Sequence, residues 1–313
     1  MEFLIAAATT LAGLFVLAYS GDKLVEGASA LAQRLKVSDV FIGIVIIGFG
    51  TSLPEVMATV SAAWMGKNEM ALGNVIGSNI ANVGLILAAA LLLAKSRENL
   101  KGNKRDYFTM LAAMALFTIL LLIFEKLSLF SGILLLVFLA FYLFLSLKSS
   151  KKGFEDEGDI SLSMGVTLLL VLGGLIGLAL GANFLINGAT SIARMFGVSE
   201  RVIGITLVAL GTSLPELAAA VAAARKGNLG LTVGNILGSN VFNVLAAASA
   251  SAVFMPLHLD GFHLDLTVMM LFALVTSLLF TGRIKISYSI LGLTLLGGYA
   301  VYTLYLIMMT QGQ

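Results

Sequence analysis

The sequence of 313 residues has no cysteine, only three prolines and one tryptophan, and few charged side chains. Because cysteine is absent, the chain can form no disulfide, thiolate metal site or thiol nucleophile. Charged residues make up 12% of the chain, about half of the roughly 25% that is typical of soluble domains. This composition argues against an ordinary soluble domain. The net charge of +2 does not point to a nucleic-acid partner, and we expect none.

Long apolar stretches make up most of the chain. Hydrophobic residues account for 59% of the chain, the mean hydropathy is +1.01, and several runs reach the ~20 residues that a helix needs to cross a bilayer. The opening MEFLIAAATT lacks the basic segment of a cleavable signal, so we expect it to begin the first span. We predict an all-α membrane protein with ten transmembrane helices, near residues 3–33, 38–65, 69–94, 106–124, 128–147, 161–195, 199–224, 228–254, 262–281 and 287–309.

The basic residues are distributed unevenly between the predicted loops. Cytoplasmic loops of membrane proteins carry an excess of Lys and Arg. We therefore expect a multi-pass protein of the plasma (cell inner) membrane with both termini outside. In this orientation 14 of the 19 Lys and Arg residues lie in cytoplasmic loops or at their edges, namely Arg34, Lys36, Lys95, Arg97, Lys101, Lys104, Arg105, Lys148, Lys151, Lys152, Arg225, Lys226, Arg283 and Lys285.

The motif GTSLPE occurs twice, at residues 50–55 and 211–216, an offset of 161 residues. At this offset, residues 50–83 and 211–244 agree at 18 of 34 positions without a gap. Each half contains five predicted spans, an odd number, so the halves must cross the membrane in opposite orientations, as in many secondary transporters. We predict two inverted repeats, the first over 1–147 and the second over 161–313, joined by a cytoplasmic linker over 148–160.

Polar residues inside the apolar spans follow the same repeat. A threonine, a serine and a glutamate share one helix face in each half, namely Thr51, Ser52 and Glu55, and Thr212, Ser213 and Glu216. The next helix carries a stripe at every fourth position, namely Asn74, Ser78 and Asn82, and Asn235, Ser239 and Asn243. Facing lipid would leave these groups without hydrogen-bond partners, so the four faces must meet one another or water near the midplane.

The repeated prolines predict broken helices at this depth. Pro54 and Pro215 have no N–H for the carbonyl four residues earlier, so carbonyl oxygens near Gly50 and Gly211 become free. Broken helices within a membrane occur where they line a site, and free carbonyls there coordinate cations. A separate glycine series at residues 173, 177 and 181 predicts a ridge for close helix packing.

The repeated side chains offer only oxygen ligands. Two glutamates supply a charge of about −2, and neither histidine lies in a repeated motif. An all-oxygen site of this charge suits a hard divalent ion such as Ca²⁺, which takes ~6–8 oxygens, whereas soft metals prefer thiolate or imidazole. Sodium also prefers oxygen and could compete for the same ligands. No cofactor is expected; Ca²⁺ and Na⁺ would be transported ions.

The paired GTSLPE and GN-x-[IL]-GSN-x-x-N blocks resemble the repeats of the cation/Ca²⁺ exchanger superfamily, especially prokaryotic sodium/calcium exchangers. The resemblance implies ten helices, alternating access and a central cluster of one Ca²⁺ site with Na⁺ sites. It also implies that Asn243, where some members carry Asp, removes a need for K⁺. The implied ligands are the carboxylates of Glu55 and Glu216, the carbonyls of Thr51 and Thr212, the Na⁺-binding serines Ser52, Ser78, Ser213 and Ser239, and the central Asn82 and Asn243.

A Na⁺/Ca²⁺ antiporter that works as a monomer in the lipid bilayer is therefore the predicted function. An H⁺/Ca²⁺ antiporter could use the same two glutamates as proton carriers, because proton coupling needs only carboxylates. An intramembrane hydrolase is disfavoured because no nucleophile–base pair or HExxH motif is present. A channel is disfavoured because channel filters usually arise from oligomeric symmetry, whereas this two-fold repeat lies within one chain.

Overall fold

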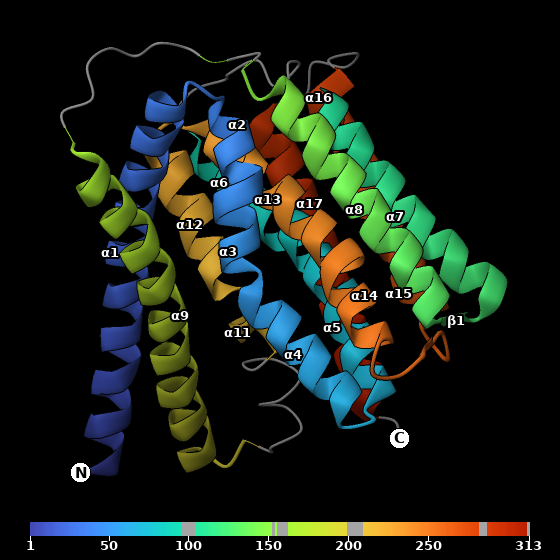
Figure 1. The fold of residues 1–313 in the computed structure, drawn as a ribbon. Helices are drawn as coiled ribbons and strands as arrows, with labels where there is room; N and C mark the ends of the chain where they lie inside the picture. The colour runs from blue at the N-terminus through green and yellow to red at the C-terminus, as the bar shows by residue number, and fades with distance from the viewer. Residues whose placement is uncertain (95–103, 152–153, 155–161, 199–208, 282–286, 312–313) are drawn as a thin grey trace.

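The computed structural model describes residues 1–94, 104–151, 154, 162–198, 209–281 and 287–311 (Figure 1). The first half contains α1 (Glu2–Leu35), α2 (Asp39–Ile42), η1 (Gly43–Gly48), α3 (Phe49–Thr51), α4 (Leu53–Trp64), α5 (Asn68–Ala81), η2 (Asn82–Leu87), α6 (Ala88–Leu93), α7 (Lys104–Phe124), β1 (Lys126–Leu127) and α8 (Leu129–Ser149). The second half contains α9 (Met164–Met195), α11 (Ala209–Gly211), α12 (Leu214–Arg225), α13 (Leu229–Phe242), η5 (Asn243–Ala247), α14 (Ala248–Ala252), β2 (Leu257–His258), α15 (His263–Val275), α16 (Ser277–Thr281) and α17 (Tyr288–Gln311).

Over the residues that the structure describes, the protein is an all-helical membrane bundle apart from one small sheet. Eight described helices are long and apolar enough to cross a bilayer, and the pair Asp39–Thr51 and Leu53–Trp64, bent by 43°, makes a ninth span. These nine begin and end within three residues of the predicted bounds. Part of the predicted span 199–224, and most of the linker 148–160, fall outside the described residues. The start of α1 and the end of α17 lie at the same end of the bundle (Figure 1).

Two short strands depart from the all-α prediction. β1 and β2 pair antiparallel, with Lys126 opposite His258 and Leu127 opposite Leu257. The side chain of Asn68, at the start of α5, joins this sheet because its amide donates to the carbonyl of His258 at 3.0 Å and accepts from the backbone N–H of His258 at 2.6 Å. Loops after α4, α7 and α14 are thereby tied together at one end of the bundle.

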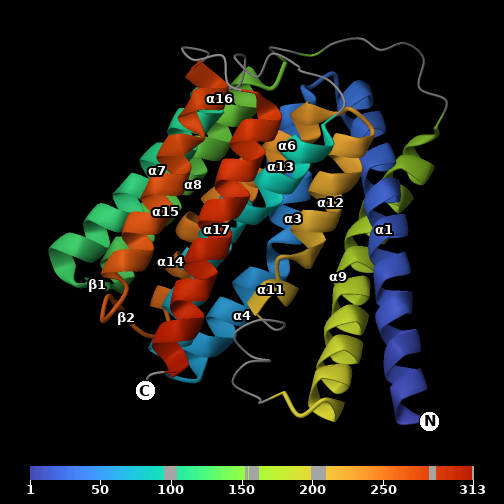
Figure 2. The same ribbon diagram turned by 180° about the vertical axis from the view of Figure 1, so that it is seen from behind.

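The helices α1 and α9 pack side by side along one flank of the molecule, as Figures 1 and 2 both show. Their contact depends on glycines. A Cβ atom placed on Gly174 would lie 2.7 Å from Leu24, and Cβ atoms on Gly177 and Gly181 would also collide with α1. The prediction for Gly177 and Gly181 is confirmed. It is wrong for Gly173, which has nothing within 4 Å, because the helix turns the next residue toward α1.

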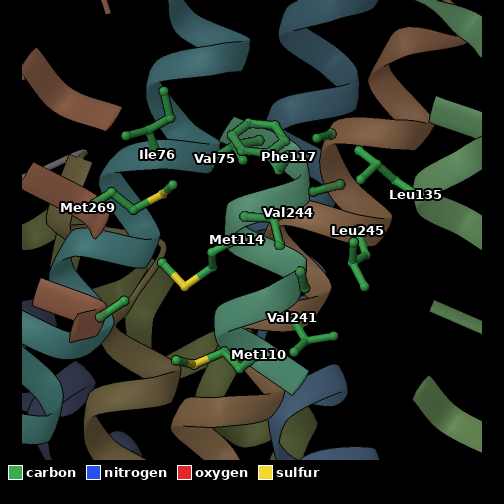
Figure 3. Close-up of a cluster of buried hydrophobic side chains, with 14 of the residues drawn as sticks. Val75, Ile76, Met110, Met114, Phe117, Leu135, Val241, Val244, Leu245 and Met269 are labelled. Carbon is green, nitrogen blue, oxygen red and sulfur yellow. The ribbon is translucent and has the colours of Figure 1, made fainter. Parts of the chain in front are cut away.

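The segments that carry the repeated motifs occupy the centre of the bundle. Over the most apolar window, 78% of residues are buried in Asn68–Leu93 and 94% in Leu229–Ala252, against 17% to 39% in the other spans. A cluster of apolar side chains, including Met110, Met114 and Val241, packs α7 against α13 and η5 (Figure 3). The central helices are therefore shielded from lipid, which allows them to carry polar groups.

The turns that follow the two motif helices have the same geometry in both halves. Gly66 between α4 and α5 has a φ of 72°, and Gly227, 161 residues later, has a φ of 81°. In each turn the residue after the glycine donates its N–H to the carbonyl five residues earlier, at 2.8 and 2.9 Å. Left-handed φ values of this kind favour glycine, so the same residue ends the helix in the same way twice.

Candidate cation site

Each GTSLPE motif lies at a break between a short helix and a longer one. Ser52 separates α3 from α4, and the break between α11 and α12 falls at the corresponding residues of the second half. Pro54 and Pro215 lie in the first turn of α4 and α12, where the missing N–H would have no helical partner in any case. The prediction of a broken helix is confirmed, but each proline begins a new helix instead of distorting a continuous one.

The two motifs contact each other through reciprocal hydrogen bonds. The hydroxyl of Ser52 donates to Oε1 of Glu216 at 3.0 Å, and the hydroxyl of Ser213 donates to Oε1 of Glu55 at 3.1 Å. Each serine lies one helical turn before the glutamate of its own motif and bonds the glutamate of the other. Both carboxylates are buried, with exposures of 1% and 2%, and each is bonded by the serine of the other motif, so two acidic groups interact electrostatically inside the bundle.

Asparagines from the second motif hold the backbone of the glutamates. Nδ2 of Asn74 donates to the carbonyl of Glu55 at 3.1 Å, and Nδ2 of Asn235 donates to the carbonyl of Glu216 at 3.2 Å. The hydroxyl of Thr51 also donates to Oδ1 of Asn235, at 3.2 Å. Both asparagines lie on the polar stripe predicted from the sequence, but no role was predicted for them. Each asparagine follows the glutamate that it bonds by 19 residues, and this equal spacing could have indicated the contact.

Several buried oxygens at the centre have no hydrogen-bond partner within the described part of the chain. They include Oε2 of both glutamates and Oδ1 of Asn79, Asn82 and Asn243. Burying such atoms without compensation costs several kcal/mol for a charged group, on the order of 1–3 kcal/mol for a neutral one. A hard cation takes oxygen ligands of both kinds. These atoms therefore fit a cation that is bound between the two repeats.

The remaining predicted residues lie around this centre. Asn82 and Asn243 each begin a π-helix, η2 and η5, a feature that is frequent at functional sites. Thr51, Ser78 and Ser239 are buried, the hydroxyl of Ser239 donating to the carbonyl of Gly48 at 3.2 Å. Thr212 is half-buried and lies beside Glu55. Asn79 and Asn240, both fully buried next to the predicted asparagines, were missed although both motif copies contain them.

The sodium/calcium exchanger protein family matches this chain over residues 5–148 and again over residues 166–308. The inner membrane protein YrbG of Escherichia coli (strain K12) is 32% identical over 313 residues, which cover 96% of each chain. The sodium/calcium exchanger MaX1 of Methanosarcina acetivorans is 30% identical over 314 residues, which cover 86% of this chain and 89% of MaX1.

Solved structures of the sodium-calcium exchanger NCX_Mj have the same fold. The structure soaked with 10 mM Na⁺ and zero Ca²⁺ matches with a TM-score of 0.86 and 30% sequence identity, over 96% of this chain and 98% of NCX_Mj. The sequence match, the fold and the multi-span architecture agree with one another. The chain belongs to the sodium/calcium exchanger protein family, whose members are membrane transporters and not enzymes.

Proposed function

We propose that this chain is a secondary active antiporter that exchanges Na⁺ for Ca²⁺ across the plasma (inner) membrane. The reciprocal bonds between Ser52 and Glu216 and between Ser213 and Glu55 carry the proposal. They draw two carboxylates together and leave the second oxygen of each for an ion. The names of MaX1 and NCX_Mj as sodium/calcium exchangers support the choice of ions, and the name of YrbG supports the inner membrane.

The charge of the proposed site implies that the two ions exclude each other. Ca²⁺ at Glu55 and Glu216 balances a charge of about −2, and in its absence Na⁺ ions must supply comparable charge to the same buried carboxylates. In this proposal the other ligands are the carbonyls of Thr51 and Thr212, the hydroxyls of Ser52, Ser78, Ser213 and Ser239, and the amide oxygens of Asn82 and Asn243.

We further propose ten spans in two inverted repeats, both termini outside, a single chain as the working unit, and alternating access. Two separate family matches support the repeat. An asymmetry between the halves supports alternating access. α1 packs closely on α12, where a Cβ on Gly21 would lie 3.0 Å from the carbonyl oxygen of Ala218. The position equivalent to Ala218 on α4 is Met57, which is 69% exposed. Exchanging the two arrangements would open the site to the other side.

Proton coupling is the alternative that one observation favours. Without a cation, two adjoining buried carboxylates repel each other, and a proton on one of them relieves that repulsion. An H⁺/Ca²⁺ antiporter would therefore use the same pair of glutamates. The two mechanisms differ in what the serine and asparagine oxygens do, because only Na⁺ requires them as ligands.

Ca²⁺ uptake into proteoliposomes distinguishes these mechanisms. Vesicles that contain the purified protein are loaded with Na⁺ and diluted into Na⁺-free buffer with radioactive Ca²⁺; a second set carries a proton gradient without Na⁺. We expect the outward Na⁺ gradient to drive uptake, external Na⁺ to inhibit it competitively, and K⁺ to be unnecessary. Uptake driven only by the proton gradient would establish the alternative, and uptake driven by neither would contradict antiport.

A further inference from the structure

Asn240 links the cation site to the apolar core. It is fully buried on α13, three residues before Asn243, and its amide contacts two other segments. Its Nδ2 donates to the sulfur of Met110 on α7 at 3.5 Å, and its Oδ1 accepts from Nδ2 of Asn82 at 3.2 Å. Three side chains from α7, α13 and η2 thus form one chain of hydrogen bonds that ends at the site.

The sulfur sets the direction of this chain. A thioether sulfur can accept a hydrogen bond but cannot donate one. The amide of Asn240 must therefore turn its nitrogen toward Met110 and its oxygen toward Asn82. Asn82 in turn donates its nitrogen, and its Oδ1 is left buried with no partner among the described residues. The opposite rotation of Asn82 would present N–H groups to the site, and these repel a cation.

We propose that Met110 and Asn240 are positioning residues that hold the amide of Asn82 with its oxygen toward the cation. The inference rests on the proposed function, because it assigns a ligand of that site. Met110 touches no ion; it acts through Asn240. Without this pair, part of the free energy of cation binding would be spent on ordering the amide.

No equivalent pair among the described residues orients Asn243, the counterpart of Asn82. The position 161 residues after Met110 is Leu271, which is 54% exposed and has no acceptor. Asn79, the counterpart of Asn240, donates instead to the carbonyl of Val75 in its own helix at 2.7 Å. Both polar atoms of Asn243 lack a partner within the described residues. The two central asparagines therefore differ, and only Asn82 is held by such a pair.

Substitution of Met110 by leucine removes the acceptor and nearly keeps the volume. Met114 provides the matched control, since it lies one turn further along α7 in the same apolar cluster (Figure 3) and is equally buried. The purified protein is heated at increasing Ca²⁺ concentrations, and the concentration that gives half-maximal protection against unfolding reports affinity without turnover. The unfolding midpoint without Ca²⁺ reports structural damage.

We expect Met110→Leu to raise the half-protecting Ca²⁺ concentration about two- to tenfold, the range that one hydrogen bond supports. Met114→Leu should leave it unchanged, with a similar midpoint without Ca²⁺. Equal affinities, or an equal loss in both variants, would overturn the inference. Failure of Ca²⁺ to protect the unmodified protein would instead contradict the proposed function.

A second background tests whether Met110 acts through Asn82. Asn82→Ala removes the amide that receives the effect of Met110 and Asn240. We expect this variant to need more Ca²⁺ for half-maximal protection than the unmodified protein, and we expect Met110→Leu to have no further effect in it. A loss of affinity on adding Met110→Leu equal to that in the unmodified protein would show that Met110 does not act through Asn82. Unchanged protection in Asn82→Ala alone would show that Asn82 is not a ligand.

Discussion

Glu55→Gln removes one of the two site charges with little change in shape. The glutamine fits the same buried position. Its side-chain oxygen can still accept the hydrogen bond that Ser213 donates to Oε1 of Glu55, at 3.1 Å in the unmodified protein. What it loses is the attraction of a carboxylate for the ion. At a separation of about 3 Å and an effective dielectric constant of about 20, a single charge attracts a divalent ion by about 11 kcal/mol.

Much of this attraction is offset, because the ion gives up water in order to bind. If the free energy of Ca²⁺ binding differs by only about 3–4 kcal/mol between Glu55→Gln and the unmodified protein, the affinity for Ca²⁺ falls about 10²- to 10³-fold. We therefore expect Na⁺-driven Ca²⁺ uptake in Glu55→Gln to fall at least about 100-fold at limiting Ca²⁺. Glu216→Gln should behave in the same way, because Glu216 is buried to the same extent and has the mirrored bond to Ser52.

The same substitution should change stability in the opposite direction. Without Ca²⁺, two adjoining buried charges repel each other, so Glu55→Gln should raise the unfolding midpoint of the ligand-free protein. Uptake and unfolding are measured beside Glu69→Gln, a glutamate exposed on α5. Uptake by Glu55→Gln within about tenfold of that by the unmodified protein would refute the reasoning. A fall in the unfolding midpoint without Ca²⁺, as a packing defect would cause, would refute it as well.

Two further predictions concern the symmetry of the site and its topology. Ser52→Ala and Ser213→Ala should weaken Ca²⁺ uptake by similar factors, about tenfold each, because each removes one hydrogen bond to a charged group; in a Ca²⁺ titration of uptake, effects that differ by more than tenfold would contradict reciprocal roles. Cysteines at Lys67 and Arg225, exposed residues near the turns after α4 and α12, should react with an impermeant thiol reagent from opposite sides of the membrane; labelling of both from one side would contradict the inverted repeat.

The spans and the polar residues of the site could be predicted because both are signalled by composition. Long apolar runs determine where helices cross, and a glutamate within such a run requires a partner. The repeat added the second copy at a fixed offset. Sequence spacing also predicted Thr51, Ser52 and Glu55 on one face; all three are buried and bond residues of the second repeat.

The individual partners in contacts between segments far apart in sequence could not be predicted, although the meeting of the polar faces was. Periodicity within one helix does not reveal that Ser52 bonds Glu216 and not Glu55, since this depends on how the two repeats dock. In the sequence, Met110 cannot be distinguished from other core methionines. Only the packing of α7 against α13 brings its sulfur to Asn240. The error at Gly173 has the same origin, because a shift of one residue along α9 turns a different glycine toward α1.

The reciprocal bonds also bear on how the protein is made. Ser213 follows Glu55 by 158 residues, so at roughly 5–20 residues per second the ribosome needs roughly 8–30 s to supply it. During that interval Glu55, which is buried in the finished protein, lacks both Ser213 and Glu216 as neighbours. A nascent first half must keep Glu55 protonated or in contact with water, and its central helices can settle only when the second half arrives.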